Sequence, residues 1–202
     1  MNTPKCLVEI HDKKIINYQL NLLKDFQNIR IVIGFKEEEV IEHVNKIRRD
    51  IIFVRNDQYL TTTNITSLIL AVRYLNKPFI LLDGDIIINK QDFCRFIEEC
   101  RNSKESIVGV TKHRSQEAVF VNIENGYIHA FSTDIKSNYE WCGIAYIHDF
   151  QINLDLLGYI YKLFEDMIPI KAFELDVYEI DTPIDYALAT KMITDRVIFD
   201  LL

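Results

Sequence analysis

The chain has 202 residues, of which 49% are hydrophobic and 26% charged, and its formal net charge is −7. These values are typical of one globular domain that buries a substantial core, and they exclude a disordered or fibrous chain. The acidic balance argues against a nucleic-acid-binding protein, because such a protein needs a concentrated basic surface. A small molecule or another protein is therefore the expected partner.

The cysteines and the apolar runs narrow the class further. The cysteines at positions 6, 94, 100 and 142 lack the C-x-x-C spacing and the nearby histidines of a zinc site. We therefore expect reduced thiols in a cytoplasmic protein. No apolar run reaches the roughly 18 residues that a membrane span needs, and the first residues do not resemble a signal peptide, so neither feature is expected.

Hydrophobic periodicity predicts alternating helices and strands in the first half of the chain. Asn64 is suited to cap one of these helices. The predicted elements in chain order are helix 12–26, strand 30–35, helix 40–47, strand 51–54, a helix that carries Leu68 to Leu75, the strand that carries Asp83 and Asp85, and helix 90–101. Such alternation, with nearly continuous apolar strands, predicts a Rossmann-like α/β fold with a mostly parallel sheet and helices on both faces.

The second half of the chain has a different pattern, with several short strands close together. Asn125-Gly126 between two of them predicts a tight hairpin, which adds a small antiparallel unit to the sheet. Pro183 suits the first turn of the last predicted helix. The predicted elements are strands 107–111, 118–123, 127–131 and 140–147, helix 153–167, an extended segment 172–180 and helix 183–194. No linker or repeat interrupts the chain, so residues 1–202 are predicted to form a single domain.

Two carboxylates at the end of an apolar strand are the most informative local feature. Asp83 and Asp85 follow Phe79–Leu82 and are separated by Gly84. On an extended chain they point the same way, and the glycine lets a ligand approach the backbone closely. Burying carboxylates is costly unless a cation neutralises them, so the pair indicates a divalent metal site. The alternative is an ordinary strand-to-turn exit, because Asp-Gly is a common turn signal.

Polar residues also follow two other predicted strands. Asn56 and Asp57 precede a loop rich in hydroxyl groups, 61–67, and Asp181 directly follows the late extended segment 172–180. Ligands of open α/β sheets bind beyond the carboxyl ends of the strands, so these positions together predict a metal-assisted phosphate site. Helix capping is the alternative role of Asp181.

Four segments in register resemble the nucleotide-diphosphosugar-type nucleotidyltransferases. Thr3–Val8 resembles the T-P-K-x-L motif of that family, and Asp83–Asp85 resembles its D-x-D metal motif. Asn56–Tyr59 with Thr63–Leu68 is similar to the N-x-x-Y…N-N-x-x-S-L segment of one branch, and Tyr178–Asp185 is similar to its closing Y-E-I-D-x-x-x-D. This branch contains the choline-phosphate cytidylyltransferases of bacterial cell-surface polysaccharide biosynthesis and their sugar-phosphate and phosphonate relatives.

The resemblance implies transfer of a nucleoside monophosphate from an NTP, with CTP favoured, to a small phosphate ester, with release of pyrophosphate. It implies Mg²⁺ as the cofactor, with Asp85 and Asp181 as its ligands and Glu179 as the second-choice ligand. Lys5 is expected to contact the nucleotide phosphates as a point charge, and it completes the catalytic set with Asp85 and Asp181. The residues that the resemblance places around the nucleotide are Thr63, Asn64, Ser67 and Asp83.

The acceptor site is expected on a late strand and on the helix near it. By the same resemblance, Tyr139, Trp141 and Glu165 are the predicted acceptor-binding residues. Aromatic faces beside a carboxylate suit a quaternary ammonium group such as that of phosphocholine. Packing in the core is the alternative role of Trp141, Tyr161 and Phe164, and a sugar phosphate is the alternative acceptor.

One part of the family pattern is absent. The family begins with a buried strand and a glycine-rich loop whose N–H groups cradle the triphosphate, whereas Met1 lies only two residues before Thr3. We therefore expect a fragment or a late start, a diverged member, or nucleotide binding by another route. A diverged member would act as a nucleotide-binding or regulatory module without turnover. A phosphate-handling hydrolase is the remaining enzyme class, but no nucleophile motif accompanies Asp83 and Asp85.

Overall fold

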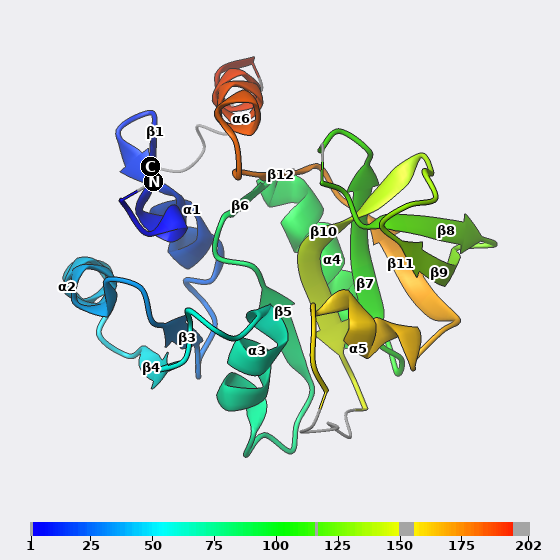
Figure 1. Ribbon diagram of the computed structural model, residues 1–202, viewed down its shortest axis with the longest axis horizontal. Coiled ribbons are helices and arrows are strands. Elements are labelled where there is room, and N and C mark those ends of the chain that lie inside the picture. The colour runs from blue at the N-terminus through cyan, green and yellow to red at the C-terminus, as the bar shows by residue number, and fades with distance from the viewer. Residues whose placement is uncertain (1, 116, 150–155, 196–202) are drawn as a thin grey trace.

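The computed structural model describes residues 2–115, 117–149 and 156–195, and it shows an α/β structure (Figure 1). The helices are η1 (Lys5–Leu7, one 3₁₀ turn), α1 (Ile15–Leu22), α2 (Glu37–Ile47), α3 (Asn64–Val72), α4 (Lys90–Asn102), α5 (Tyr161–Glu165) and α6 (Pro183–Asp195). The strands are β1 (Glu9–Ile10), β2 (Lys13–Lys14), β3 (Arg30–Ile33), β4 (Ile52–Arg55), β5 (Phe79–Leu82), β6 (Ile86–Ile88), β7 (Ile107–Lys112), β8 (Phe120–Glu124), β9 (Tyr127–Ser132), β10 (Tyr139–Ile147), β11 (Ile170–Glu174) and β12 (Val177–Glu179). Across these ranges, no helix is both long enough and apolar enough to cross a membrane.

Six strands form one sheet in the order β5-β10-β7-β11-β9-β8. β8 also pairs with β10, where Tyr139 lies opposite Val121 and Glu140 opposite Phe120, so five of these strands close into a ring. β5 joins the ring by pairing with β10, and the remaining strands pair as β1–β2, β3–β4 and β6–β12. Figure 1 shows the ring on one side of the molecule, β3 and β4 on the other, and β5 and β6 between them.

The prediction of a mostly parallel sheet is wrong, because the sheet is mixed. Among the described strands, parallel pairing is confined to β3–β4 and β7–β11. β10 runs antiparallel between β5 and β7, with Ile144 opposite Leu82 and Ala145 opposite Val108. A continuous apolar run indicates that a strand is buried on both faces, but it does not fix the direction of the neighbouring strand.

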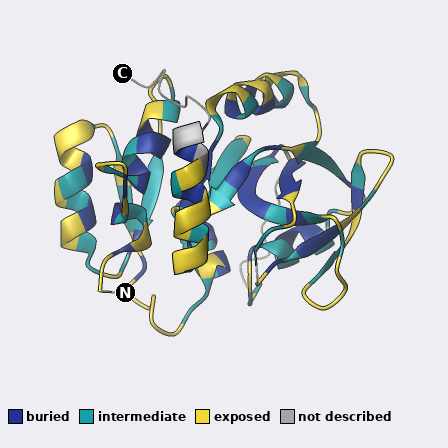
Figure 2. Cartoon of the chain, turned by 90° about the horizontal axis from the view of Figure 1, so that it is seen from above, coloured by how far each residue is buried: buried dark blue, intermediate teal, exposed yellow. Residues whose placement is uncertain are grey.

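Helices cover both faces of the central strands. α3 and α5 lie on one side, where Ile65 and Phe164 are buried with Val108. α4 lies on the other side, where Phe96 is buried with Ile144. Figure 2 shows the buried residues gathered along the central strands and the exposed residues on the outward faces of the helices. This packing holds β5 and β6, which carry the aspartates between them, in the middle of the molecule.

Helix α3 joins the β3–β4 pair to the rest of the domain. The guanidinium of Arg30 on β3 donates a hydrogen bond to the carbonyl oxygen of Ala71 in α3, and Val32 packs against the cluster that contains α3. β3 pairs with β4 along one edge, and β5 pairs with β10 along one edge. In the described ranges, the other edge of β3 and the other edge of β5 have no ladder partner. Side-chain packing and the hydrogen bond of Arg30 therefore connect these two parts in place of a shared ladder.

Two late elements differ from the prediction. The expected helix 153–167 is confined to Tyr161–Glu165 in the described residues, and residues 153–155 lie outside them. Gly158 has a φ of 106°, a left-handed conformation that an α-helix does not contain. The extended segment 172–180 is divided between β11 and β12.

Candidate active site

The turn between β5 and β6 carries Asp83 and Asp85. Gln19 of α1 is buried and donates hydrogen bonds from Nε2 to the carbonyl oxygens of Asp83, at 2.8 Å, and Ile86, at 3.0 Å. The N–H of Asp83 donates to the carbonyl oxygen of Gly143 on β10, at 2.8 Å. These bonds fix the backbone of the turn from two sides, so the backbone that carries both carboxyl groups is held in place.

Strand β12 brings two more carboxylates to this turn. In the antiparallel ladder with β6, Glu179 lies opposite Ile86. The N–H of Ile180 then donates to the carbonyl oxygen of Asp85 at 3.0 Å, and Asp181 follows directly. Backbone pairing therefore places Glu179 and Asp181 beside Asp85, although about a hundred residues separate them along the chain.

Helix α6 has a cap that does not involve Asp181. The Oδ2 atom of Asp185 accepts hydrogen bonds from the N–H and the hydroxyl of Thr182, at 2.8 and 2.7 Å. In return, the N–H of Asp185 donates to Thr182 Oγ1 at 3.2 Å. Helix capping, the alternative role of Asp181, is thus carried out by its neighbours, and Asp181 takes part in the carboxylate group instead.

Helix η1 places Lys5 against these carboxylates. Lys5 Nζ lies 3.2 Å from Asp85 Oδ2 and also contacts Asp181 Oδ1. η1 packs close to the turn, because a Cβ atom at Gly84 would lie 3.8 Å from the Cβ of Cys6. Burial lowers the pKa of Lys5, but the hydrogen bond to Asp181 and the charges of Asp85 and Asp181 outweigh it and raise that pKa above its usual value. The side chain is therefore an ammonium ion at neutral pH.

Asp85, Glu179 and Asp181 form a candidate cation site, here called the carboxylate cluster. One oxygen from each of the three side chains lies within 4.8 Å of the other two. Carboxylate oxygens are the ligands that Mg²⁺ prefers, so this donor set fits that ion. Burial raises the pKa of Asp85, whereas the charge of Lys5 opposes that shift. A cation at this position would likewise favour the ionised form.

Asp83 lies outside the carboxylate cluster. A Cβ atom at Gly143 would be 3.1 Å from both Cβ and Oδ2 of Asp83, so the side chain of Asp83 lies against β10. Burial, and then the charges of Asp85 and Glu179, raise the pKa of Asp83 well above its usual value. The position suits a residue that supports the cluster rather than a direct ligand.

Replacing Glu179 with glutamine is expected to stabilise the cation-free protein. Burial, and then the charges of Asp85 and Asp181, raise the pKa of Glu179 from 4.5 to about 7. Because the pKa of Glu179 is raised in the folded state, the free energy of unfolding decreases as pH rises from about 4.5 through 7. Over this range the carboxyl group ionises among like charges. Water reaches part of this residue and screens some of the repulsion, so we expect the melting temperature to rise by about 2–4 °C above pH 7 and by less near pH 5. Melting curves in EDTA test this, and equal melting temperatures above pH 7 would contradict it.

Thr63, Asn64 and Ser67, predicted to border the nucleotide, gather at the N-terminus of α3. Asn64 is the first residue of this helix rather than its cap, and Thr63 occupies the N-cap position. The hydroxyl of Thr63 and the side-chain oxygen of Asn64 bind the backbone of residues 158–160. Ser67 Oγ accepts a hydrogen bond from Asn56 Nδ2 at 3.1 Å. These three residues thus lie together in the first turns of α3 and at its N-cap, and their role toward a nucleotide stays a prediction.

The three predicted acceptor residues do not form one group. The hydroxyl of Tyr139 donates to Glu174 at 3.1 Å, and Glu165 forms an ion pair at 2.9 Å with a lysine of its own helix. The ring of Trp141 packs on the buried ring of Phe164, with 5.0 Å between centroids. Of the three, only Trp141 lines the small cavity that adjoins Glu179. Phe164 therefore packs in the core, which was the alternative role considered for it. The part of Trp141 that contacts Phe164 packs there as well.

The cavity beside Glu179 is lined by Arg114, which the sequence reasoning missed, and by Glu140, which lies on the strand expected to face the acceptor. Its free volume is about 20 Å³. Glu140 is buried and accepts hydrogen bonds from His113 Nδ1, at 2.7 Å, and from the N–H of Arg114, at 3.3 Å. The guanidinium of Arg114 lies over the ring of Tyr178, 4.2 Å from its centroid. Glu140, a charged residue at the start of the predicted strand 140–147, is the sequence signal on this side of the site. The complete lining is Thr111, Arg114, Ser115, Glu140, Trp141, Cys142, Val177, Tyr178, Glu179, Asp185 and Leu188.

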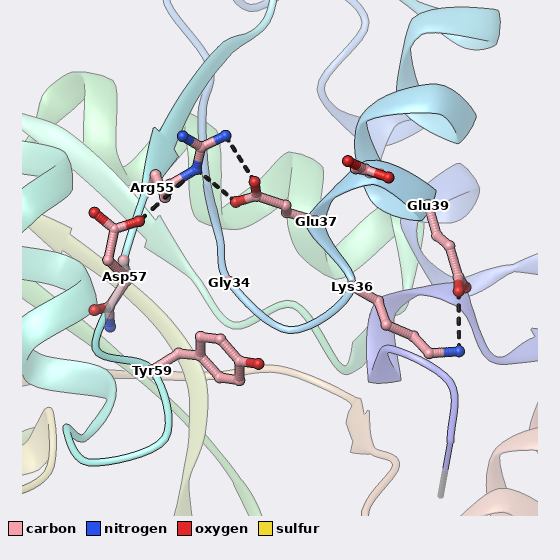
Figure 3. Close-up of a pocket in the computed structure, with 9 residues that line it drawn as sticks. Gly34, Lys36, Glu37, Glu39, Arg55, Asp57 and Tyr59 are labelled. Atoms are coloured by element: carbon pink, nitrogen blue, oxygen red, sulfur yellow. Dashed lines mark hydrogen bonds and ion pairs between the residues drawn. The ribbon is translucent and has the colours of Figure 1, made fainter.

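A larger cavity, of about 530 Å³, opens where β3 and β4 end and α2 begins. Figure 3 shows Arg55 between Glu37 and Asp57, and Lys36 turned toward Glu39. The ion pairs are 2.6 Å from Arg55 to Glu37 and 2.9 Å from Lys36 to Glu39. Both cations are thus neutralised within the cavity, and none of the predicted catalytic residues lines it. The carboxylate cluster is therefore the stronger candidate for the active site.

Solved structures of nucleotide-transferring enzymes share this fold. The inositol-1-phosphate CTP transferase from T. maritima superposes with a TM-score of 0.70 at 20% identity, covering 95% of this chain and 88% of that one. The CTP:phosphocholine cytidylyltransferase from Streptococcus pneumoniae superposes with a TM-score of 0.74 at 20% identity, covering 95% and 90%. At such low identity, these likenesses establish the fold alone.

Sequence comparisons identify the family. The choline-phosphate cytidylyltransferase of Streptococcus pneumoniae (strain ATCC BAA-255 / R6) is 32% identical over 94 residues, a match that spans 46% of this chain and 40% of that protein. The CTP:phosphoglutamine cytidylyltransferase of Campylobacter jejuni is 26% identical over 180 residues, which is 80% of this chain and 70% of that protein. The family model of the MobA-like NTP transferase domain matches residues 1–137, which include Lys5 and Asp85. The chain therefore belongs to the family of MobA-like NTP transferase domains.

Proposed function

We propose that the chain is a Mg²⁺-dependent nucleotidyltransferase that moves CMP from CTP to a small phosphorylated acceptor and releases pyrophosphate. The observation that carries this proposal is the convergence of Lys5 with Asp85, Glu179 and Asp181 from three segments far apart in the chain. Family membership supports nucleotidyl transfer, and relatives named as cytidylyltransferases support CTP as the donor.

Asp85 and Asp181 would hold the Mg²⁺ ion, with Glu179 next to them. When bound at such a site, the ion polarises the α-phosphate and offsets the charge that develops on it. The turn between β5 and β6 and the ladder between β6 and β12 fix Asp85 and Glu179 before any substrate binds. Nucleotidyl transfer depends mainly on positioning and electrostatic stabilisation, so this rigid placement is the main contribution expected of the protein.

Lys5 supplies positive charge for the nucleotide phosphates. In the proposed transfer, an oxygen of the acceptor phosphate attacks the α-phosphorus, and the bond from that phosphorus to the bridging β-phosphate oxygen breaks. Pyrophosphate leaves with the electron pair of that bond. The ammonium of Lys5 is a compact point charge that stabilises the phosphate oxygens while this exchange takes place.

For the acceptor we propose the surface at the mouth of the cavity beside Glu179, because a free volume of about 20 Å³ holds roughly one water molecule and not a phosphate ester. Arg114, Glu140 and Trp141 line it from β10 and from the loop after β7. The guanidinium of Arg114, which already pairs with Asp176 at 2.8 Å, suits a phosphate group if that pair is exchanged. The ring of Trp141, beside the carboxylate of Glu140, suits a cationic group. Choline phosphate and phosphoglutamine, which appear in the names of two relatives, are therefore the first acceptors to test. Sugar phosphates and inositol phosphate come next.

Release of pyrophosphate from CTP tests the proposal. We expect release that requires Mg²⁺ and one acceptor from a panel of phosphocholine, phosphoglutamine, inositol 1-phosphate and hexose 1-phosphates, and that stops when EDTA is added. ATP, GTP and UTP serve as alternative donors. If no pair of donor and acceptor yields pyrophosphate, the proposal is wrong. Binding of CTP in a calorimeter without turnover would then support the alternative, a nucleotide-binding or regulatory module.

A further inference from the structure

A side-chain cation already occupies the carboxylate cluster. Lys5 Nζ lies 3.2 Å from Asp85 Oδ2 and contacts Asp181 Oδ1. Asp85 and Asp181 also supply two of the three side-chain oxygens that lie within 4.8 Å of one another. The ammonium therefore sits against the oxygens that a divalent ion would use.

An ammonium group and a divalent ion compete for these oxygens. Mg²⁺ binds its ligands at about 2.1 Å in a strict octahedral arrangement, and it repels a neighbouring positive charge. The side chain of Lys5 is 50% exposed, whereas that of Asp85 is 17% exposed. Lys5 is thus the partner with room to move, on a flexible stem, while the backbone of η1 stays anchored by the buried side chain of Leu7.

We propose that Lys5 holds the place of the divalent cation in the substrate-free protein and turns to the nucleotide phosphates when that cation binds. This inference rests on the proposed function. Without nucleotide, the cation must displace Lys5, which weakens its binding. With nucleotide present, the phosphates offer Lys5 another partner, so the cation and the nucleotide strengthen each other's binding by the same factor.

Binding of Mn²⁺ to nucleotide-free protein, followed by the electron paramagnetic resonance of the free ion, tests the displacement. Lys5→Met is expected to bind Mn²⁺ roughly 3- to 30-fold more tightly than the wild type, because two partly exposed ion pairs no longer compete. Lys46→Met is the matched control. It removes the same charge from α2, where Lys46 pairs with Glu42 at 2.7 Å, and its affinity for Mn²⁺ is expected to be unchanged.

Chemical labelling of the unaltered protein gives an independent readout. Acylation of each lysine, measured by peptide mass spectrometry, should become several-fold faster at Lys5 as Mg²⁺ is added, while Lys13 and Lys46 stay constant. Equal Mn²⁺ affinity of wild type and Lys5→Met, or unchanged labelling of Lys5 at saturating Mg²⁺, would show this inference to be wrong and leave the proposed function standing. If neither protein binds the ion without nucleotide, this inference is wrong as well, because removal of Lys5 then frees no cation site, and the addition of EDTA to the transfer assay tests the cation dependence of the proposed function separately.

Discussion

Replacing Asp85 with asparagine is expected to lower kcat/KM for nucleotidyl transfer by about 10²–10³-fold. Its side chain is 17% exposed, compared with 40% for Asp181, so it is the more enclosed of the two carboxylates that bind Lys5. An amide carries no negative charge and offers one oxygen in place of two, which weakens both cation binding and the contact with Lys5. The assay is pyrophosphate release at varied CTP and acceptor concentrations.

The fold of the Asp85→Asn variant is expected to be intact. The side chain of Asp85 accepts a hydrogen bond from the exposed side chain of Lys5 and one from a backbone N–H, and an amide oxygen can accept both. Asp134→Asn, in the exposed loop between β9 and β10, removes one negative charge away from the cluster and should keep wild-type activity. Circular dichroism of both variants shows whether they fold. Wild-type turnover by folded Asp85→Asn would contradict the assigned site.

Replacing Gly143 with alanine is expected to destabilise the fold by about 2–4 kcal/mol and to disturb Asp83. Gly143 has a φ of 80°, a conformation that costs an alanine energy. The added Cβ would also lie 3.1 Å from Asp83 Cβ, Asp83 Oδ2 and Ile86 Cγ2. Because the N–H of Asp83 is bonded to the carbonyl oxygen of Gly143, a shift of β10 moves the turn that carries Asp85. Urea unfolding measures the loss of stability, and the assay of pyrophosphate release measures the second effect.

Gly126 offers a matched control for Gly143. Its φ is 83°, nearly the same, but an added Cβ would meet no atom within 4 Å. Gly126→Ala therefore reports the conformational cost alone, about 1–2 kcal/mol, and should leave activity unchanged. The difference between the two variants measures the crowding against Asp83 and Ile86. Equal losses of stability at both positions would contradict the contact between β10 and the turn.

Elements whose signals lie within a few residues could be predicted from the sequence. The hairpin at Asn125-Gly126 is confirmed, with φ values of 51° and 83°, as a tight two-residue turn requires. The last helix also begins at Pro183, as its position predicts. The helix over 153–167 fails for the described residues because apolar spacing does not reveal the left-handed backbone at Gly158.

Strand order and direction depend on contacts that are distant in the sequence. The alternating first half suggested that each new strand joins its predecessor in parallel. In the structure β10, from Tyr139 to Ile147, inserts between β5 and β7 and pairs antiparallel with both. Nothing within these strands specifies that insertion, because each of them has apolar side chains on both faces.

The candidate site could likewise be predicted only in part from the sequence. The structure brings Lys5 to Asp85 and Asp181 across separations of 80 and 176 residues, as the resemblance of the motifs implied. The acceptor side had no such motif, and the aromatic residues chosen for it serve largely in packing. The charged residues that line the cavity, Arg114 and Glu140, come together only through the fold of β7 and β10.

Transfer of label from CTP carrying ³²P at the α-phosphate tests the central claim most directly. The account predicts that the label appears in a CDP-linked acceptor and that none appears in pyrophosphate. It also predicts that this transfer requires Mg²⁺ and is lost in the Asp85→Asn variant. Label that stays in CTP with every acceptor, or that appears as CMP whether or not an acceptor is present, would contradict the account.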